Sequence, residues 1–363
     1  MGDSILVMAS LNNDDKRIPV ATLRPAIEAL FRALGVPQDD AAVITDVHLD
    51  AELRGEQSHG LRMIPVHIGR LQAGSVRPVP AINTLRDKGA MALLDAGHSI
   101  GQVVASRAMK MAIAKAGEFG VGIVGVRNAE SFTSSKYYPL MAVDAGMIGI
   151  CYANSLPMMP PHGGTTPKVG NNPMAFAAPA GEEFPFVLDF ANTIAKEKIR
   201  QALAEGRAMP RDWALGRDGR PTTDPQEALL SGVLLPFGGY KAFGIGAAHE
   251  ILTSVLCGGE LFTGAGSGFT PADNPYRGSQ FFQAIDIEWF MPLAEFRQRL
   301  DTMIRTIRDT PPAPGHDSVY VPGERGFREM PERTRRGIPV RPAVLDQLNA
   351  LAAKLGVERI PAS

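Results

Sequence analysis

The sequence predicts an α/β or α+β fold, in which helices from both chain ends surround a mixed middle region. Three observations predict it. Up to residue 74, apolar residues recur at the spacing of one face of a helix. Beyond Pro78 and Pro80, short apolar runs of strand length alternate with helical patterns. A last helical pattern at 341–355 is expected to pack back on the N-terminal helices.

The N-terminal part is predicted to form three helices, at 22–34, at 39–54 and a third that ends at Gly74. Their inward faces are Leu23, Ile27, Leu30, Phe31 and Leu34; Val43, Val47 and Ala51; and Ile64, Ile68 and Leu71. The break at 55–60 reads Gly-Glu-Gln-Ser-His-Gly, so His59 lies at the entrance of the third helix. Free backbone N–H groups at such an entrance favour an anionic carboxylate.

The middle region is predicted to alternate strands and helices. The expected strands are 91–94, 121–126, 147–153, 186–190, 232–235 and 283–289. The expected helices are 102–119, 138–145, 193–205, 242–256 and 293–307. The Gly- and Pro-rich stretches 211–223, 261–278 and 310–323 are expected to be loops or linkers. No internal repeat is visible.

The segment Gly120-Val121-Gly122-Ile123-Val124-Gly125 matches the letters of a dinucleotide-binding fingerprint. In that fingerprint a strand precedes the glycines and a helix begins at the last of them. Here a helix precedes Gly120 and the motif itself has strand character. We therefore expect these glycines to end the helix and thin the strand, and we reject a Rossmann site.

Composition excludes several classes of protein. The chain has 363 residues and a formal net charge of -1, which gives no reason to expect nucleic acid or a membrane surface as partner. Its two cysteines, Cys151 and Cys257, lie in apolar runs, and no secretory signal is evident, so a reducing cytoplasmic location is expected. Neither a metal-binding histidine spacing nor a Gly-x-Ser-x-Gly elbow occurs.

Six motifs occur in an order that resembles the malate/L-lactate dehydrogenase family of the non-Rossmann type. The first is the helix end and loop Arg54-Gly55-Glu56-Gln57-Ser58-His59-Gly60. The others are 101–104 with 122–128; 154–157 with 161–164 and 170–173; 188–193; 235–242; and 321–324 with 336–339. The resemblance covers about residues 22 to 339.

The resemblance implies a mainly antiparallel central sheet that binds NAD(P)H, flanked by a helical domain built from both chain ends. It divides the chain into a helical domain at 1–80, a cofactor- and substrate-binding domain at 81–309, and a C-terminal segment at 310–363 that packs back on the first. It also implies a homodimer, a small carboxylate substrate and a site between the domains. Whether the cofactor is NADH or NADPH stays open.

The resemblance also implies roles for individual residues. Hydride transfer to a carbonyl builds charge on its oxygen, and a histidine can meet that oxygen with a proton, so His59 is the expected acid/base and Ser58 its orienting partner. The cofactor-binding residues implied are Ser155, Asn171, Asn172, Asp189, Phe190, Ala191, Lys241, Ala242, Gly323 and Glu324. Capping and turn formation are the alternative roles for Ser58, the asparagines and the glycine.

The substrate side departs from the family pattern. Ser131 stands where the family has a second active-site histidine, and the Gly-Gly that usually follows is Ser134-Ser135-Lys136 here. Lys136 adds a cation that could bind a substrate carboxylate or point outward. Met63 stands where many members have arginine, with Arg62 one position earlier. The substrate-binding residues expected are Arg62, Met63, Ser131, Lys136 and Asn154.

Three hypotheses about function follow. The first is a hydride-transferring enzyme for a 2-oxo or 2-hydroxy acid. The second is a reductase of cyclic imine 2-carboxylates, because hydride delivery to C=N is similar chemistry. The third is a cofactor-binding protein that has lost or altered catalysis, which the residues at Ser131 and Met63 motivate.

Overall fold

A seven-stranded sheet forms the centre of the computed structural model, which describes residues 15–194, 196–266 and 276–361. Its strand order is β2 (Asn83–Lys88), β3 (Met91–Asp95), β4 (Val121–Ala129), β10 (Gly278–Asp286), β5 (Met147–Ala153), β8 (Met174–Ala178), β9 (Phe186–Phe190). β3 and β4 run parallel, and the other neighbouring pairs are antiparallel. The mainly antiparallel sheet is as predicted.

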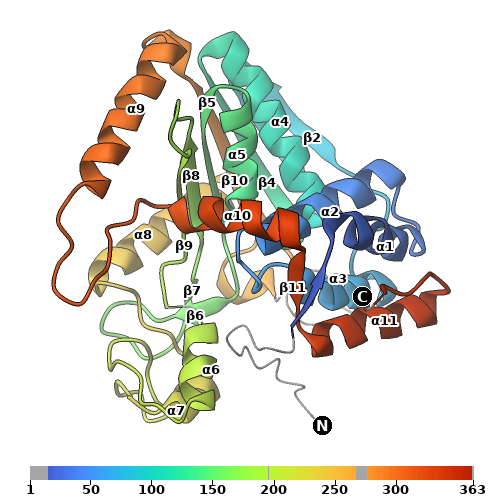
Figure 1. Ribbon diagram of the computed structural model, residues 1–363, viewed down its shortest axis with the longest axis vertical. Coiled ribbons are helices and arrows are strands. Elements are labelled where there is room, and N and C mark those ends of the chain that lie inside the picture. The colour runs from blue at the N-terminus through green and yellow to red at the C-terminus, as the bar shows by residue number, and fades with distance from the viewer. Residues whose placement is uncertain (1–14, 195, 267–275, 362–363) are drawn as a thin grey trace.

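Helices α4 (Gly101–Phe119) and α5 (Tyr137–Asp144) pack against this sheet (Figure 1). The core between them includes Val104, Met109, Val124, Tyr138 and Phe282. Gly120 ends α4 in a left-handed conformation with φ of 79°, and β4 begins at the next residue. A Cβ on Gly122 would lie 1.9 Å from the carbonyl oxygen of Ala112, so this glycine lets α4 approach the strand. The rejection of a Rossmann fingerprint is confirmed.

Helices from both chain ends form a second core. α1 (Val20–Arg32), α2 (Gln38–Leu53) and α3 (Ile64–Gln72) lie with α11 (Pro342–Leu355), and β1 (Lys16–Ile18) pairs antiparallel with β11 (Ile338–Val340) (Figure 1). The apolar residues that meet there include Leu23, Ile27, Phe31, Ile64, Val344 and Leu348. Burial of each such side chain contributes about 1.5–3 kcal/mol, so this cluster fastens the C-terminal segment to the first helices.

The remaining elements lie around the sheet. A smaller core, with Ile199, Ala202 and Leu234, joins α6 (Lys196–Ala204) to α7 (Pro225–Ser231). The other elements are β6 (Pro157–Met159), β7 (Val169–Gly170), α8 (Tyr240–Glu250), the π-helical turn η2 (Ile251–Val255), the 3-10 turn η3 (Phe262–Ala265), α9 (Leu293–Arg308) and α10 (Glu324–Arg336). No helix among the described residues is long and apolar enough to cross a membrane.

Several predicted elements differ from the structure. The strand expected at 232–235 is wrong: Leu234 makes one isolated bridge to Ala214 and continues no ladder. The helix expected at 242–256 begins at Tyr240 and passes into η2. The strand expected at 283–289 begins earlier, at Gly278, and ends at Asp286, where the 3-10 turn η4 (Ile287–Trp289) follows. Residues 267–275 of the predicted Gly-rich loop lie outside the described residues.

Candidate active site

The Ser58-His59-Gly60 segment forms a tight turn between α2 and the 3-10 turn η1 (Leu61–Met63), which leads into α3. Gly55 takes a left-handed φ of 82°, which ends the path of α2. The backbone N–H of His59 donates to the carbonyl of Glu56 at 2.9 Å. The turn therefore carries His59 on a short, internally bonded loop between two rigid helical elements.

The ring of His59 is held by its neighbour, because Ser58 Oγ lies 2.8 Å from His59 Nδ1. Burial lowers the pKa of His59, and the cations of Arg62 and Lys136 lower it further, while the carboxylates of Glu56 and Glu197 oppose the shift. His59 therefore lies between two clusters of charged side chains, each of which contains both signs. Because its pKa is lowered, its imidazole is neutral at neutral pH in this structure.

The first set is a cluster of Glu56, Lys136 and Asp189. Lys136 Nζ forms an ion pair with Glu56, whose other oxygen accepts a hydrogen bond from Ser134 Oγ at 2.9 Å. The backbone N–H of Lys136 donates to Asp189 Oδ2 at 3.3 Å. Burial and the charge of Glu56 raise the pKa of Asp189 to about 7. The cluster therefore joins the His59 turn to the end of β9.

The second set is Arg62 with two charges from α6. Arg62 Nη2 donates to Glu197 Oε1 at 2.8 Å, and Arg200 Nη1 reaches the same oxygen at 2.5 Å. Arg62 Nε and Nη1 are buried without a hydrogen-bond partner among the described residues. A carboxylate of a ligand would satisfy such groups, because guanidinium N–H groups match carboxylate oxygens. Met63, 5% exposed, is covered by protein.

The two remaining substrate-side residues, Ser131 and Asn154, differ in how firmly hydrogen bonds hold their side chains. Ser131 is half-buried in the loop after β4, and its Oγ accepts a long hydrogen bond of 3.4 Å from the N–H of Thr133. Asn154 is 3% exposed and both polar atoms of its amide are bonded: Nδ2 donates to Ser254 Oγ at 2.7 Å, and Oδ1 accepts from Ser279 N at 2.7 Å. The side chain of Asn154 thus ties β5 to η2 and β10.

The predicted cofactor residues at 155 and 171–172 form one network. Ser155 Oγ donates to Asn171 Oδ1 at 2.6 Å, and the N–H of Ser155 donates to Asn172 Oδ1 at 3.0 Å. Asn172 Nδ2 donates to Glu250 Oε2 at 2.7 Å. Asn192 Nδ2 closes the network by donating to the carbonyl of Asn172 at 2.7 Å. These polar groups fix the loop geometry between β5, β7 and α8.

Two further predicted segments lie side by side. Thr193 bridges Pro236, and Phe237 N donates to the carbonyl of Asn192 at 3.1 Å, which brings 189–191 close to the start of α8. The rings of Phe190 and Phe237 meet edge to face with centroids 5.7 Å apart. In the first turn of α8, Lys241 is exposed and Ala242 is fully buried.

These residues fit a nicotinamide dinucleotide. The exposed ammonium of Lys241 stands at the N-terminus of α8, where the unpaired N–H groups and the helix dipole also favour phosphate. The aromatic pair beside it offers an apolar surface for a planar ring. Among the described residues no group of three or more histidine, cysteine or acidic side chains is arranged to hold a metal ion.

Gly323 and Glu324 lie behind β9 and support it. Gly323 has a φ of 90°, and a Cβ there would lie 2.8 Å from Val187 Cβ, so only glycine fits this position without strain. Glu324 is 2% exposed, accepts a hydrogen bond from Val321 N at 3.0 Å and pairs with Arg328. Contacts within the protein therefore account for the residue type at both positions.

Sequence reasoning gave no site role to four titratable residues near the turn that carries His59: His48, Glu52, Glu56 and Glu197. His48 and Glu52 are one helical turn apart on α2, close in sequence to the Ser-His-Gly motif, which was an available signal. Glu197 is far away in sequence, and its approach depends on how α6 packs.

Comparison with known proteins gives matches over nearly the whole chain. The profile of the family described as malate/L-lactate dehydrogenase matches residues 18–349. The malate dehydrogenase of Pyrococcus horikoshii is 36% identical over 350 residues, covering 94% of this chain and 96% of that enzyme. Its solved structure has a TM-score of 0.88 at 34% identity, covering 98% of this chain and 100% of that one.

Two further relatives differ in their named chemistry. The L-sulfolactate dehydrogenase of Methanocaldococcus jannaschii is 37% identical over 329 residues, covering 90% of this chain and 94% of that enzyme. The structure of Δ1-piperideine-2-carboxylate reductase from Pseudomonas syringae has a TM-score of 0.83 at 28% identity, covering 93% of this chain and 100% of that one.

Proposed function

The chain belongs to the malate/L-lactate dehydrogenase family, an oxidoreductase family, and we propose on that premise that it interconverts a small 2-oxo acid and its 2-hydroxy acid with NAD(P)H. The observation that carries the proposal is the Ser58–His59 contact of 2.8 Å, in a turn whose neighbour Arg62 has two side-chain nitrogens, Nε and Nη1, without a partner among the described residues. A proton donor and a carboxylate-binding cation thus occur together.

Each substrate-side residue has a proposed role. Bound nicotinamide would supply or accept the hydride. His59 gives a proton to the carbonyl oxygen in reduction and removes it in oxidation, and Ser58 orients the ring through Nδ1. Arg62 binds the substrate carboxylate, and Lys136 provides a second positive charge. Met63 and Ser131 line the substrate side, and Asn154 shapes it by holding β5 to β10.

The cofactor would lie along the second set of residues. Lys241 and the first turn of α8 hold phosphate, and Asp189, Phe190 and Ala191 border the nicotinamide side at the end of β9. Ser155, Asn171 and Asn172 shape the adjoining loops, and Gly323 and Glu324 support β9 from behind. Nothing in this set distinguishes NADH from NADPH.

Reduction of a cyclic imine 2-carboxylate is the second candidate. The carboxylate of Glu56 close to His59 favours it, because a negative charge stabilises a protonated C=N nitrogen. The third hypothesis, lost catalysis, is disfavoured because the Ser58–His59 contact is intact.

We also propose a homodimer in a reducing cytoplasm. Apolar side chains on α8 and its continuation are unusually exposed for a monomer: Tyr240, Ile251, Val255 and Leu256 are 57% to 64% exposed. Cys151 and Cys257 are both free and buried. Two unpaired thiols are common in reducing compartments.

The test is steady-state oxidation of NADH and of NADPH with a panel of 2-oxo acids and cyclic imines. Turnover of one class and cofactor assigns the reaction. His59→Ala is expected to lower kcat about 10²–10⁴-fold. The control His316→Ala removes an exposed histidine and should leave kcat unchanged. Full activity of His59→Ala, or no turnover with any substrate although cofactor binds, would sink the proposal.

A further inference from the structure

Two side chains of α2 form hydrogen bonds to the backbone of the turn that carries His59. His48 Nδ1 lies 3.2 Å from the backbone oxygen of His59, and Glu52 Oε1 accepts a hydrogen bond from the backbone N–H of Leu61 at 2.8 Å. Because His48 and Glu52 are four residues apart, they share one face of the helix. They contact the two peptide units that flank Gly60.

Glu52 also explains the glycine of the motif. A Cβ on Gly60 would lie 2.1 Å from Glu52 Oε1, so the carboxylate occupies the space that any other residue at 60 would need. Glu52 is 4% exposed, and burial raises its pKa to about 7, although the Leu61 N–H and nearby arginines oppose the shift. A carboxyl group this costly to bury has a specific contact to maintain.

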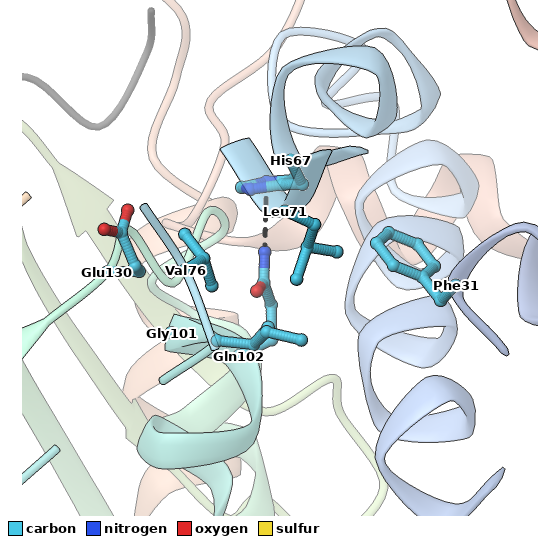
Figure 2. Close-up of a pocket in the computed structure, with 8 residues that line it drawn as sticks. Phe31, His67, Leu71, Val76, Gly101, Gln102 and Glu130 are labelled. Atoms are coloured by element: carbon cyan, nitrogen blue, oxygen red, sulfur yellow. Dashed lines mark hydrogen bonds between the residues drawn. The ribbon is translucent and has the colours of Figure 1, made fainter. Parts of the chain in front are cut away.

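His48 is a neutral donor. It is fully buried, and burial lowers its pKa to about 4. A carbonyl oxygen only accepts, so the proton of the neutral ring lies on Nδ1. His67, which bonds to Gln102 at 3.1 Å in the small pocket of Figure 2, packs against His48 with ring centroids 5.3 Å apart. This packing fixes the His48 ring plane.

Helix α10 also contacts the end of α2 beside this turn. Arg333 Nη1 donates to the carbonyl of Glu52 at 2.8 Å, and Arg333 is paired with Glu329 at 2.7 Å. A Cβ on Gly55 would lie 2.4 Å from Glu329 Oε2. α10 therefore fixes the end of α2 from which both His48 and Glu52 project.

We propose that His48 and Glu52 are positioning residues that set the direction of the His59 side chain. The direction of a side chain follows from the two peptide planes beside its Cα. At His59 one plane is fixed by the N–H bond to Glu56, and the other by the bond from His48, with Glu52 holding the next peptide. This inference rests on the proposed function of His59, because only an acid/base needs such precision.

The test uses isosteric variants in the full-length enzyme. Glu52→Leu removes the acceptor, Glu52→Gln keeps an oxygen acceptor, and His48→Phe removes the donor at similar volume. The control Thr45→Val alters a buried residue of α2 whose hydroxyl bonds only within the helix, to Ala41 at 2.8 Å. Each variant is measured for kcat, KM, cofactor affinity and the NMR titration of the His59 imidazole.

We expect Glu52→Leu and His48→Phe to lower kcat about 10–100-fold while cofactor affinity changes less than about twofold, because a displacement near 1 Å can cost about 10²-fold. Glu52→Gln should retain kcat within about threefold, since it restores the acceptor. The His59 resonances should move in the first two variants and stay in Glu52→Gln and Thr45→Val.

Equal loss of kcat in Thr45→Val, or unchanged His59 resonances in folded Glu52→Leu and His48→Phe, overturns the positioning role. The NMR titration does not need turnover. An enzyme without activity on any 2-oxo acid or imine therefore refutes the proposed function, while the His59 resonances still decide the positioning role. Should Glu52→Leu fail to fold, His48→Phe compared with Thr45→Val still tests whether the bonds to this turn set the position of His59.

Discussion

Arg70 of α3 and Glu130, the residue after β4, form a buried two-contact ion pair. Arg70 Nε lies 2.9 Å from Glu130 Oε2 and Nη2 lies 2.8 Å from Oε1, with the side chains 0% and 4% exposed. Glu130 Oε1 also accepts the backbone N–H of Tyr276 at 2.9 Å. The pair connects the helical part to the sheet beside Ser131, so the substrate loop depends on it.

Glu130→Gln should therefore destabilise the protein by about 3–5 kcal/mol, because it removes the charge of one member of a buried, two-contact ion pair. Arg70→Met combined with Glu130→Gln should recover much of that loss, since the glutamine still accepts from Tyr276. Denaturant unfolding measures both. Neutralising the exposed pair Arg217–Glu227 is the control and should change the midpoint little. A double variant as unstable as Glu130→Gln would contradict this account.

Lys136→Met should raise the pKa of His59. Lys136 lowers that pKa by its own charge, and its removal also leaves Glu56 unpaired, so both changes stabilise the imidazolium. In the pH profile of kcat/KM, the limb that reports the ionisation of His59 should move to higher pH. In the reduction direction, where protonated His59 donates, activity should extend to higher pH. Lys110→Met, an exposed lysine of α4, is the control. An unchanged profile, or a shift to lower pH, would contradict this effect of Lys136 on His59.

Arg62→Gln should raise KM for the acid substrate about 10–100-fold with a smaller effect on kcat, because a charge-assisted hydrogen bond contributes about 1.5–3 kcal/mol. Glu197→Gln should lower KM, since Glu197 competes for the same guanidinium at 2.8 Å. Arg211→Gln, in the exposed loop before α7, is the control. The same KM in wild type and Arg62→Gln would exclude Arg62 as the carboxylate ligand.

The helices and strands could be predicted from the sequence wherever the periodicity of apolar residues was strong. The strands Met147–Ala153 and Phe186–Phe190 have the predicted ends, and the ends of α1, α2 and α4 differ from prediction by no more than two residues. The family resemblance, built on six ordered motifs, is confirmed by the match over residues 18–349. The domain boundaries and the roles of the site residues stay predictions.

Two of the missed elements, β2 and α10, lack a clear apolar pattern. β2, Asn83–Lys88, is an edge strand with every residue exposed, so nothing alternates. α10 contains Pro331 and many charges, and few of its residues are buried. Glu197 was missed for another reason: it comes near His59 only through tertiary packing, which local spacing does not encode.

The buried, neutral state of His48 predicts a pH-dependent stability. Its pKa is about 4 in the folded protein, against 6.5 for an ordinary histidine, so below pH 6.5 the unfolded chain binds more protons than the folded one. Stability therefore falls as the pH decreases from 6.5 towards 4, by on the order of 3 kcal/mol for this residue alone.

Glu52 and Asp189, whose pKa values are raised to about 7, act in the opposite direction, because they take up protons on folding in the same range. The effect of His48 is therefore isolated by comparison with His48→Gln, which does not titrate. The free energy of unfolding of the wild type minus that of the variant should decrease steadily as the pH is lowered from 6.5 to 4. Urea unfolding at closely spaced pH values measures it. A difference independent of pH would mean that the His48 imidazole takes up protons in the folded protein as readily as in the unfolded chain.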